Sequence, residues 1–205
     1  MVTLYVAKLV EVSPKLLTKV SEERRNRILN CKDAETRKQL LSAGLLLNTV
    51  QEINGLADVS VQKGAHGKPE ISGMQFNLSH TDGLVLCAVG NKPVGCDAEK
   101  IKTAPSGIAE RFFCEREKQY LNVCKDRYDE EFFRIWTIKE SYMKMTGEGI
   151  HLSMQSFDVC IDSEIQICRE GNQVPCFVKE YDIPGYRVTV CAQEKEFAEL
   201  IWEEL

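Results

Sequence analysis

The sequence predicts an α+β protein in which helices cover antiparallel sheets. The order of the segments is the first reason: a strand, then helices, then strands occur once over residues 1–92 and again over residues 93–205. The spacing of the apolar residues is the second, because it changes between the two-residue repeat of strands and the 3.6-residue repeat of helices. We therefore expect two similar α/β halves, 1–92 and 93–205, with a ligand site in the cleft between them.

In the first half, a short strand over residues 2–10 precedes the helices. Ser13-Pro14 and Ser21-Glu22-Glu23 indicate helix starts, because serine caps a helix and proline fits its first position. Apolar spacing predicts a long buried helix from Asp33 to about Ile53, and glycine and proline predict a loop over residues 64–71. Two strands are then expected, residues 75–78 and 84–90, and the polar run from Ser79 to Gly83 follows the first of them; a third strand, residues 93–98, begins the second half.

The second half is predicted to contain a helical region, a central helix and further strands. The helical region spans residues 105–124, and the central helix runs from about Asp129 to Met145. Ile135, Ile138, Tyr142 and Met145 form one apolar stripe along that helix, and the Gly147-Glu148-Gly149 run ends it. The remaining strand-like segments are residues 157–161, 164–168, 176–181, 186–192 and the end of the chain.

Composition excludes several classes of protein. The hydrophobic and charged fractions, 43% and 28%, are those of a globular protein, and no apolar run is long enough to cross a bilayer. The net charge of −5 argues against a general nucleic-acid binder. The N-terminus lacks the pattern of a secretory leader, so we expect a cytoplasmic protein, and a monomer. The nine cysteines contain no Cys-x-x-Cys spacing and are expected to be mostly buried, reduced thiols rather than zinc ligands.

Acidic side chains from two distant segments are the candidate catalytic groups. Asp97 and Glu99 are two residues apart in a predicted strand, so both carboxylates face one side and repel each other unless a cation lies between them. Glu140 and Lys144 are neighbours on the central helix, on a side shared with Phe133 and Trp136. A solvated surface pair is the alternative for Glu140 and Lys144, although such pairs seldom lie among large apolar groups.

Basic side chains supply the complementary charge that an anionic ligand needs. Arg24, Arg25 and Arg27 form a positive patch in a chain that is acidic overall, although such runs are often only solvated faces. The long helix starts near Arg37 and Lys38, and a helix N-terminus with nearby cations suits a phosphate. Lys68 in the loop, and Ser79 and His80 after the strand, complete the set of candidates: one wall of the cleft would hold these three, and the other the carboxylates and Lys144.

Taken together, these segments resemble the 4′-phosphopantetheinyl transferase superfamily, in its larger, pseudo-dimeric type that activates peptide synthetases and acyl carrier proteins. Five short patterns carry the resemblance, in order and over most of the chain: Gly67-Lys68-Pro69; Asn77-Leu78-Ser79-His80; Gly95-Cys96-Asp97-Ala98-Glu99; Arg111-Phe112-Phe113 with Glu117; and Trp136-x-x-Lys139-Glu140-x-x-x-Lys144-x-x-Gly147-x-Gly149. The resemblance implies two halves related by a pseudo-twofold axis.

The resemblance also implies roles for particular residues. Asp97, Glu99 and Glu140 would hold Mg²⁺, Lys144 and His80 would contact the phosphates of coenzyme A, and Lys68, Pro69 and Ser79 would line the nucleotide site. Arg24 and Arg27 correspond to basic residues for the 3′-phosphate, and either Arg37 or Lys38 to the basic position at the start of the long helix.

The implied reaction transfers the phosphopantetheine arm from coenzyme A to a serine of an apo acyl or peptidyl carrier protein and releases 3′,5′-ADP. Glu140 or Glu99 would accept the proton of the serine hydroxyl, and the sequence leaves that choice open. Two other functions also stay open: another Mg²⁺-dependent phosphoryl enzyme such as a phosphatase or nuclease, and a non-catalytic module that binds a carrier protein or a nucleotide.

Overall fold

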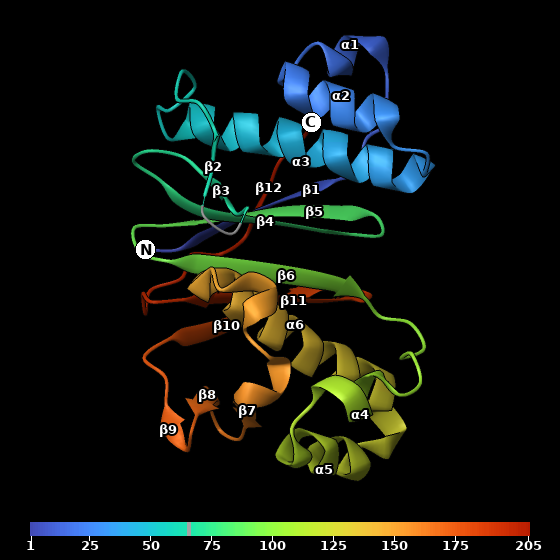
Figure 1. Ribbon diagram of the computed structural model, residues 1–205, viewed down its shortest axis with the longest axis vertical. Helices are drawn as coiled ribbons and strands as arrows, with labels where there is room; N and C mark the ends of the chain where they lie inside the picture. The colour runs from blue at the N-terminus through green and yellow to red at the C-terminus, as the bar shows by residue number, and fades with distance from the viewer. Residues whose placement is uncertain (65–66) are drawn as a thin grey trace.

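The computed structural model describes residues 1–64 and 67–205 and consists of four layers (Figure 1). Helix α3 covers one sheet, which has the strand order β12-β1-β5-β4, and α1 and α2 lie on the side of α3 that faces away from this sheet. A second sheet, β10-β11-β6, packs against the other side of the first sheet and is itself covered by α6, with α4 and α5 beyond that helix. The predicted α+β class, with antiparallel sheets covered by helices, is confirmed.

The elements of the first half begin where the capping residues predict. Side chains of Ser13, Ser21 and Asp33 accept hydrogen bonds from backbone N–H groups in the first turns of α1, α2 and α3. The bounds are β1 Thr3–Lys8, α1 Pro14–Leu17, α2 Glu22–Asn30, α3 Ala34–Ile53, β2 Gln62–Lys63, β3 Pro69–Glu70, β4 Gln75–Thr81 and β5 Leu84–Gly90.

The second half contains the central helix, α6, which ends at Gly147 as predicted. Gly147 has a φ angle of +75°, in the left-handed region that glycine adopts without strain. The bounds are β6 Val94–Lys100, α4 Ile108–Phe112, α5 Glu115–Val123, α6 Tyr128–Thr146, β7 Asp158–Ile161, β8 Ile165–Arg169, β9 Asn172–Gln173, β10 Phe177–Ile183, β11 Tyr186–Ala192 and β12 Ile201–Trp202, with short 3₁₀ turns at Lys125–Arg127, Gly149–His151 and Met154–Ser156.

Both halves repeat one strand order. In each half the first strand pairs with the second strand of a later antiparallel hairpin, which gives the orders β1-β5-β4 and β6-β11-β10. A long helix, α3 or α6, follows the first strand of each half. The final strand, β12, pairs in parallel with β1, so the end of the chain joins the first sheet. The boundary at residues 92 and 93 and the pseudo-twofold relation stay predictions.

The main core lies between the two sheets. Leu4 and Val6 of β1 point into it together with Val188 and Val190 of β11, whereas the alternate residues of β1 point to α3. All four residues of the predicted apolar stripe on α6 are buried. The nine cysteines are free thiols, five of them buried. Among residues 1–64 and 67–205, no helix has the length and apolar composition that crossing a membrane requires.

Three sequence predictions need correction. The strand predicted to end at Leu78 continues to Thr81, because it pairs with β5 along its whole length; Ser79 and His80 therefore lie within the strand. Residues 105–124 form two helices, since Glu117 accepts a hydrogen bond from the backbone of Cys114 and caps a new helix there. The loop over residues 64–71 contains the short strand β3, and its residues 65 and 66 lie outside the described residues.

Candidate active site

The site forms where α6 crosses β6, and Gly95 permits that crossing. A Cβ atom at Gly95 would collide with the carbonyl oxygen of Ser141 and the backbone nitrogen of Met145. Without a side chain at this position, the backbone of α6 lies directly on β6. The close approach brings the side chain of Lys144 to that of Asp97.

Lys144 connects the two halves of the molecule. Its Nζ donates hydrogen bonds to Asp97 Oδ1 at 2.6 Å, to Ser79 Oγ at 3.1 Å and to the carbonyl oxygen of Cys96 at 3.2 Å. Ser79, on β4 of the first half, donates to the same Asp97 oxygen at 2.9 Å. Ser79, Asp97 and Lys144, which the sequence assigned to opposite walls of one cleft, are therefore in direct contact.

The second oxygen of Asp97 has no hydrogen-bond partner among the described residues. Asp97 is 5% exposed, and its Oδ2 is buried without a hydrogen bond to any described residue. A buried acceptor left unpaired costs about 1–3 kcal/mol, so such atoms are uncommon and need an explanation. A cation or a donor from a ligand would satisfy this oxygen.

The charge of Asp97 affects the pKa values of both Glu99 and Glu140. Burial raises the pKa of each above its usual value, and the negative charge of Asp97 raises it further. Burial alone would lower the pKa of Lys144, but Asp97 and other neighbours outweigh it, and the net shift is upward. Lys102 and Lys144 act against the upward shift at Glu99, so three carboxylates and two ammonium groups leave an excess of negative charge in this part of the molecule.

Carboxylate oxygens are ligands that a hard divalent cation prefers, although the side chains do not form a complete metal site by themselves. Across residues 1–64 and 67–205, no three His, Cys, Asp or Glu side chains are arranged to hold a metal ion. Mg²⁺, however, commonly binds through one or two carboxylates together with waters and substrate phosphates, so it needs no closed set of protein ligands. The unpaired oxygen of Asp97 and the mutual repulsion of the carboxylates fit such an ion, and the ligand set of Asp97, Glu99 and Glu140 stays a prediction.

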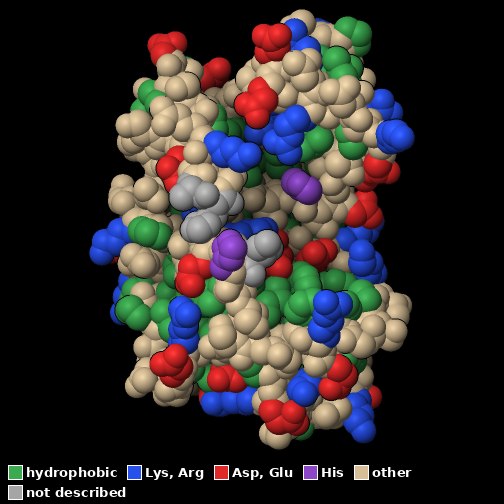
Figure 2. Space-filling model, viewed as in Figure 1, with side chains coloured by type: hydrophobic (Ala, Val, Ile, Leu, Met, Phe, Trp, Pro, Cys, Tyr) green, Lys and Arg blue, Asp and Glu red, His purple; other side chains and the backbone are tan. Residues whose placement is uncertain are grey.

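Basic groups of the first half lie near this cluster. His80 is exposed on β4, yet desolvation, followed by the positive charge of Lys144, lowers its pKa; Asp97 and Arg24 also act on it. Figure 2 shows lysine, arginine and histidine side chains above and in the hollowed middle of one face, with acidic side chains at its lower edge and a hydrophobic band beneath them.

Arg24 is a largely buried cation, on which only Glu23 among the charges that shift its pKa acts favourably. It lies across Gly44 of α3, where a Cβ atom would collide with its side chain, and its Nη1 donates to the carbonyl oxygen of Leu40 at 3.1 Å. Burial, and then the charge of Arg27, lower the pKa of Arg24. Within the described part of the chain it forms no ion pair. An anion would supply the missing charge.

The start of α3 bears on the choice between Arg37 and Lys38. Lys38 forms an ion pair with Glu11 at 2.5 Å. No ion pair of Arg37 is found within the described residues, which favours Arg37 as the group free to meet a ligand. Arg27 is exposed and likewise without an ion pair among those residues.

The ammonium of Lys68 contacts the backbone of both α6 and β6, and the predicted role of Lys68 in the nucleotide site stays a prediction. Its Nζ donates to the carbonyl oxygens of Lys144 at 2.9 Å and Val94 at 3.4 Å. Lys68 and Pro69 line a cavity of about 500 Å³ together with residues from the start of β4 and the C-terminal end of α6.

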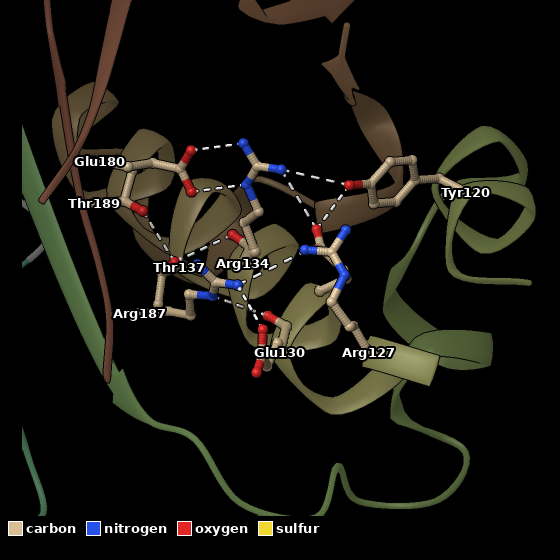
Figure 3. Close-up of polar contacts among 9 residues, drawn as sticks. Tyr120, Arg127, Glu130, Arg134, Thr137, Glu180, Arg187 and Thr189 are labelled. Atoms are coloured by element: carbon tan, nitrogen blue, oxygen red, sulfur yellow. Dashed lines mark hydrogen bonds and ion pairs between the residues drawn. The ribbon is translucent and has the colours of Figure 1, made fainter. Parts of the chain in front are cut away.

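Sequence reasoning missed the polar network that fixes the first half of α6 (Figure 3). Arg134 donates to both oxygens of Glu180 on β10 at 2.8 and 2.7 Å, and Thr137 hydrogen-bonds Thr189 at 3.0 Å. Thr189 is the cross-strand neighbour of Asp97. The network therefore holds α6 on the sheet beside the site, and no local spacing signals these partners because they are about 50 residues away.

Comparison with known proteins finds a family match that includes the candidate site residues. Residues 93–191, which include all three candidate carboxylates and Lys144, match the 4′-phosphopantetheinyl transferase superfamily. The chain is 33% identical to the 4′-phosphopantetheinyl transferase ffp of Bacillus subtilis, covering 92% of this chain and 89% of the relative. It is 31% identical to the 4′-phosphopantetheinyl transferase Sfp of Bacillus subtilis strain 168, covering 95% and 93%.

Among solved structures, holo-[acyl-carrier-protein] synthase of Thermotoga maritima aligns with 51% of this chain and 64% of its own, at 20% identity and a TM-score of 0.43. The assignment rests instead on the two relatives from Bacillus subtilis, which this chain matches over most of their length. Those matches confirm the resemblance found in the motifs. The chain therefore belongs to the 4′-phosphopantetheinyl transferase superfamily and is an enzyme of that class.

Proposed function

We propose that the protein transfers the 4′-phosphopantetheine arm of coenzyme A to a serine hydroxyl of an apo acyl or peptidyl carrier protein, in a Mg²⁺-dependent reaction that releases 3′,5′-ADP. The contact of Lys144 with Asp97, whose other oxygen is buried and unpaired, carries this proposal. It joins a cation for phosphate to a carboxylate whose second oxygen has no hydrogen-bond partner among the described residues.

Asp97, Glu99 and Glu140 would hold the metal ion. When bound, Mg²⁺ neutralises charge on the pyrophosphate of coenzyme A and orients it. At these three residues the chain supplies carboxylate oxygens, which are the ligand type that Mg²⁺ prefers, and an excess of negative charge.

The basic residues would bind the phosphates. Lys144 donates to the pyrophosphate as a point charge, next to the bond that breaks, and His80 donates to a neighbouring phosphate oxygen. Arg24, Arg27 and Arg37 would hold the 3′-phosphate, because Arg24 has no ion pair among the described residues. Pro69 and Ser79 would line the nucleotide site.

Glu140, or Glu99 in its place, would accept the proton of the serine hydroxyl. The serine oxygen then forms a bond to the β-phosphorus of coenzyme A, and the bond from that phosphorus to the oxygen of 3′,5′-ADP breaks. A positioned base contributes about 10²- to 10⁴-fold to such a step. A cytoplasmic location and a monomeric state stay expectations from the sequence.

Intact-mass measurement of carrier proteins tests the proposal. Apo carriers of the fatty acid, polyketide and peptide classes are incubated with coenzyme A, Mg²⁺ and the protein. We expect each accepted carrier to gain the mass of one phosphopantetheine arm and its Ser→Ala variant to gain none. Hydrolysis of coenzyme A without a labelled carrier would instead identify a phosphatase, and an unchanged carrier with folded protein would refute the transfer.

A further inference from the structure

The ammonium of Lys68 joins two segments that are far apart in the sequence. Its Nζ is 2.9 Å from the carbonyl oxygen of Lys144 and 3.4 Å from that of Val94. Lys144 lies in the last turn of α6, which ends at Thr146, and Val94 is the first residue of β6. One side chain of the first half therefore contacts both elements that carry the Lys144–Asp97 pair.

This arrangement satisfies groups that the helix leaves open. The last four carbonyl groups of an α-helix have no partner within the helix. A cation at that end pairs with them and with the negative end of the helix dipole. Lys68 supplies such a cation to the residue whose own side chain binds Asp97.

No ion pair among the described residues compensates the charge of the Lys68 ammonium, and burial lowers the pKa of Lys68. Its hydrogen-bond partners among the described residues are two backbone carbonyl groups, and both belong to the second half. The cost of burying this ammonium is thus met by contacts that fix the position of α6 on β6.

We propose that Lys68 is a positioning residue, which holds the last turn of α6 against the start of β6 and so sets where the Lys144 ammonium lies relative to Asp97. The role rests on the proposed function and differs from a direct contact with the nucleotide. Lys68 acts through Lys144, and the catalytic group is Lys144 itself.

Steady-state kinetics separate the two roles. In Lys68→Met the aliphatic stem remains and the ammonium is lost. Because small displacements of a catalytic group are costly, we expect kcat to fall about 10- to 100-fold, with the KM for coenzyme A close to that of the wild type. Lys68→Arg, which keeps a cation able to donate to both carbonyls, recovers part of kcat. Lys63→Met, an exposed change on the same hairpin, leaves both constants unchanged.

A double-mutant cycle tests whether Lys68 acts through Lys144. Residues that act as one unit are non-additive, so Lys68→Met adds no further loss in a Lys144→Met background. A raised KM with unchanged kcat, or fully additive losses, would overturn the proposal and favour a nucleotide contact. Should Lys68→Met not fold, Lys68→Gln, which keeps an uncharged N–H donor group, is measured in the same way.

Hydrogen exchange in the free protein gives a readout that needs no transfer activity. We expect amides in the last turn of α6 to exchange faster in Lys68→Met than in the wild type or in Lys63→Met, and protection to return in Lys68→Arg. If the amides of Lys68→Met exchange at the wild-type rate, Lys68 does not hold α6 in place, and this conclusion does not depend on whether the protein has transfer activity. If the wild type transfers no arm while exchange changes as expected, the proposed function fails and the structural hold of Lys68 remains.

Discussion

Two neighbouring residues of α6 lie in opposite electrostatic surroundings. Lys139 and its partner Glu117 are fully buried, with Nζ and Oε1 2.6 Å apart. Lys139 also donates to the carbonyl oxygen of Phe157, and Glu117 accepts from the backbone N–H groups of Cys114 and Val159. Every charge in this pair is balanced and hydrogen-bonded.

Glu140, the next residue, belongs to an unbalanced cluster. In that cluster three carboxylates outnumber the two ammonium groups that act on them, those of Lys144 and Lys102, and one oxygen of Asp97 has no hydrogen-bond partner among the described residues. One helix thus carries both kinds of site: the balanced pair fixes α5, α6 and β7 together, while the unbalanced cluster costs stability and offers charge to a ligand.

The largest expected effect is on activity. Glu140→Gln keeps the shape of the side chain but removes the base and one proposed metal ligand, so kcat should fall about 10²- to 10⁴-fold. The stability of the free protein should not decrease, because a repelled carboxylate is lost. Glu148→Gln, at an exposed pair with Arg169, is the matched control and should change neither property. Near-normal transfer by Glu140→Gln would remove Glu140 from the mechanism.

The balanced pair should show the opposite response. Lys139→Met leaves Glu117 as a buried, uncompensated charge, and we expect a loss of about 3–5 kcal/mol in the free energy of unfolding. Chemical denaturation measures this loss. A second change, Glu117→Leu in the Lys139→Met background, should restore part of it.

Lys118→Met on the exposed side of α5 serves as the control for that pair. Its ion pairs with Glu110 and Glu115 lie at the surface, so its effect should be within about 1 kcal/mol. Equal losses at Lys118 and Lys139 would show that burial does not distinguish the two positions.

A smaller effect is expected for Arg24, which has no ion pair among the described residues. Arg24→Gln should raise the KM for coenzyme A about 10- to 100-fold, the range that one charged hydrogen-bonding group contributes. Kinetics with coenzyme A lacking its 3′-phosphate give the control, since wild type and variant should then be alike. Lys32→Gln, an exposed change after α2, should have no effect. A loss that persists without the 3′-phosphate would place Arg24 elsewhere.

The smallest effect concerns pH. The raised pKa values of Glu99 and Glu140 mean that the folded protein binds protons more tightly at these groups than the unfolded chain does. Their contribution to stability is therefore greatest at a pH below the pKa of an ordinary carboxyl group, and it falls as the pH rises through the raised pKa values. With chelator present, the Tm of Glu140→Gln should exceed that of the wild type by about 2–4 °C near pH 8, as about 1 kcal/mol gives at this size. The difference should vanish near pH 4, and a constant difference would contradict the assigned cause.

Local signals predicted much of this structure. Ser13, Ser21 and Asp33 start their helices, Gly147 ends α6, and the apolar stripe of α6 is buried, because caps and periodicity are encoded within a few residues. The spacing of Asp97 and Glu99 likewise placed both residues on β6.

Contacts between segments far apart in the chain could not be predicted from the sequence. Nothing near Lys68 in the sequence indicates that its ammonium binds the carbonyl of Lys144, 76 residues away. The Lys139–Glu117 pair and the collision that keeps position 95 a glycine depend in the same way on how α5, α6 and β6 pack. These are tertiary effects, and a single sequence without the fold does not specify them.

Calorimetric titration of Mg²⁺ into the protein saturated with coenzyme A tests the central claim, that the unbalanced carboxylates are a cation site. We expect saturable binding by the wild type and by Glu148→Gln, and its loss in Asp97→Asn and Glu140→Gln with folded protein. Equal binding by all four proteins would show that the ion, if it acts, is held elsewhere, and the proposed role of Asp97, Glu99 and Glu140 as metal ligands would be wrong.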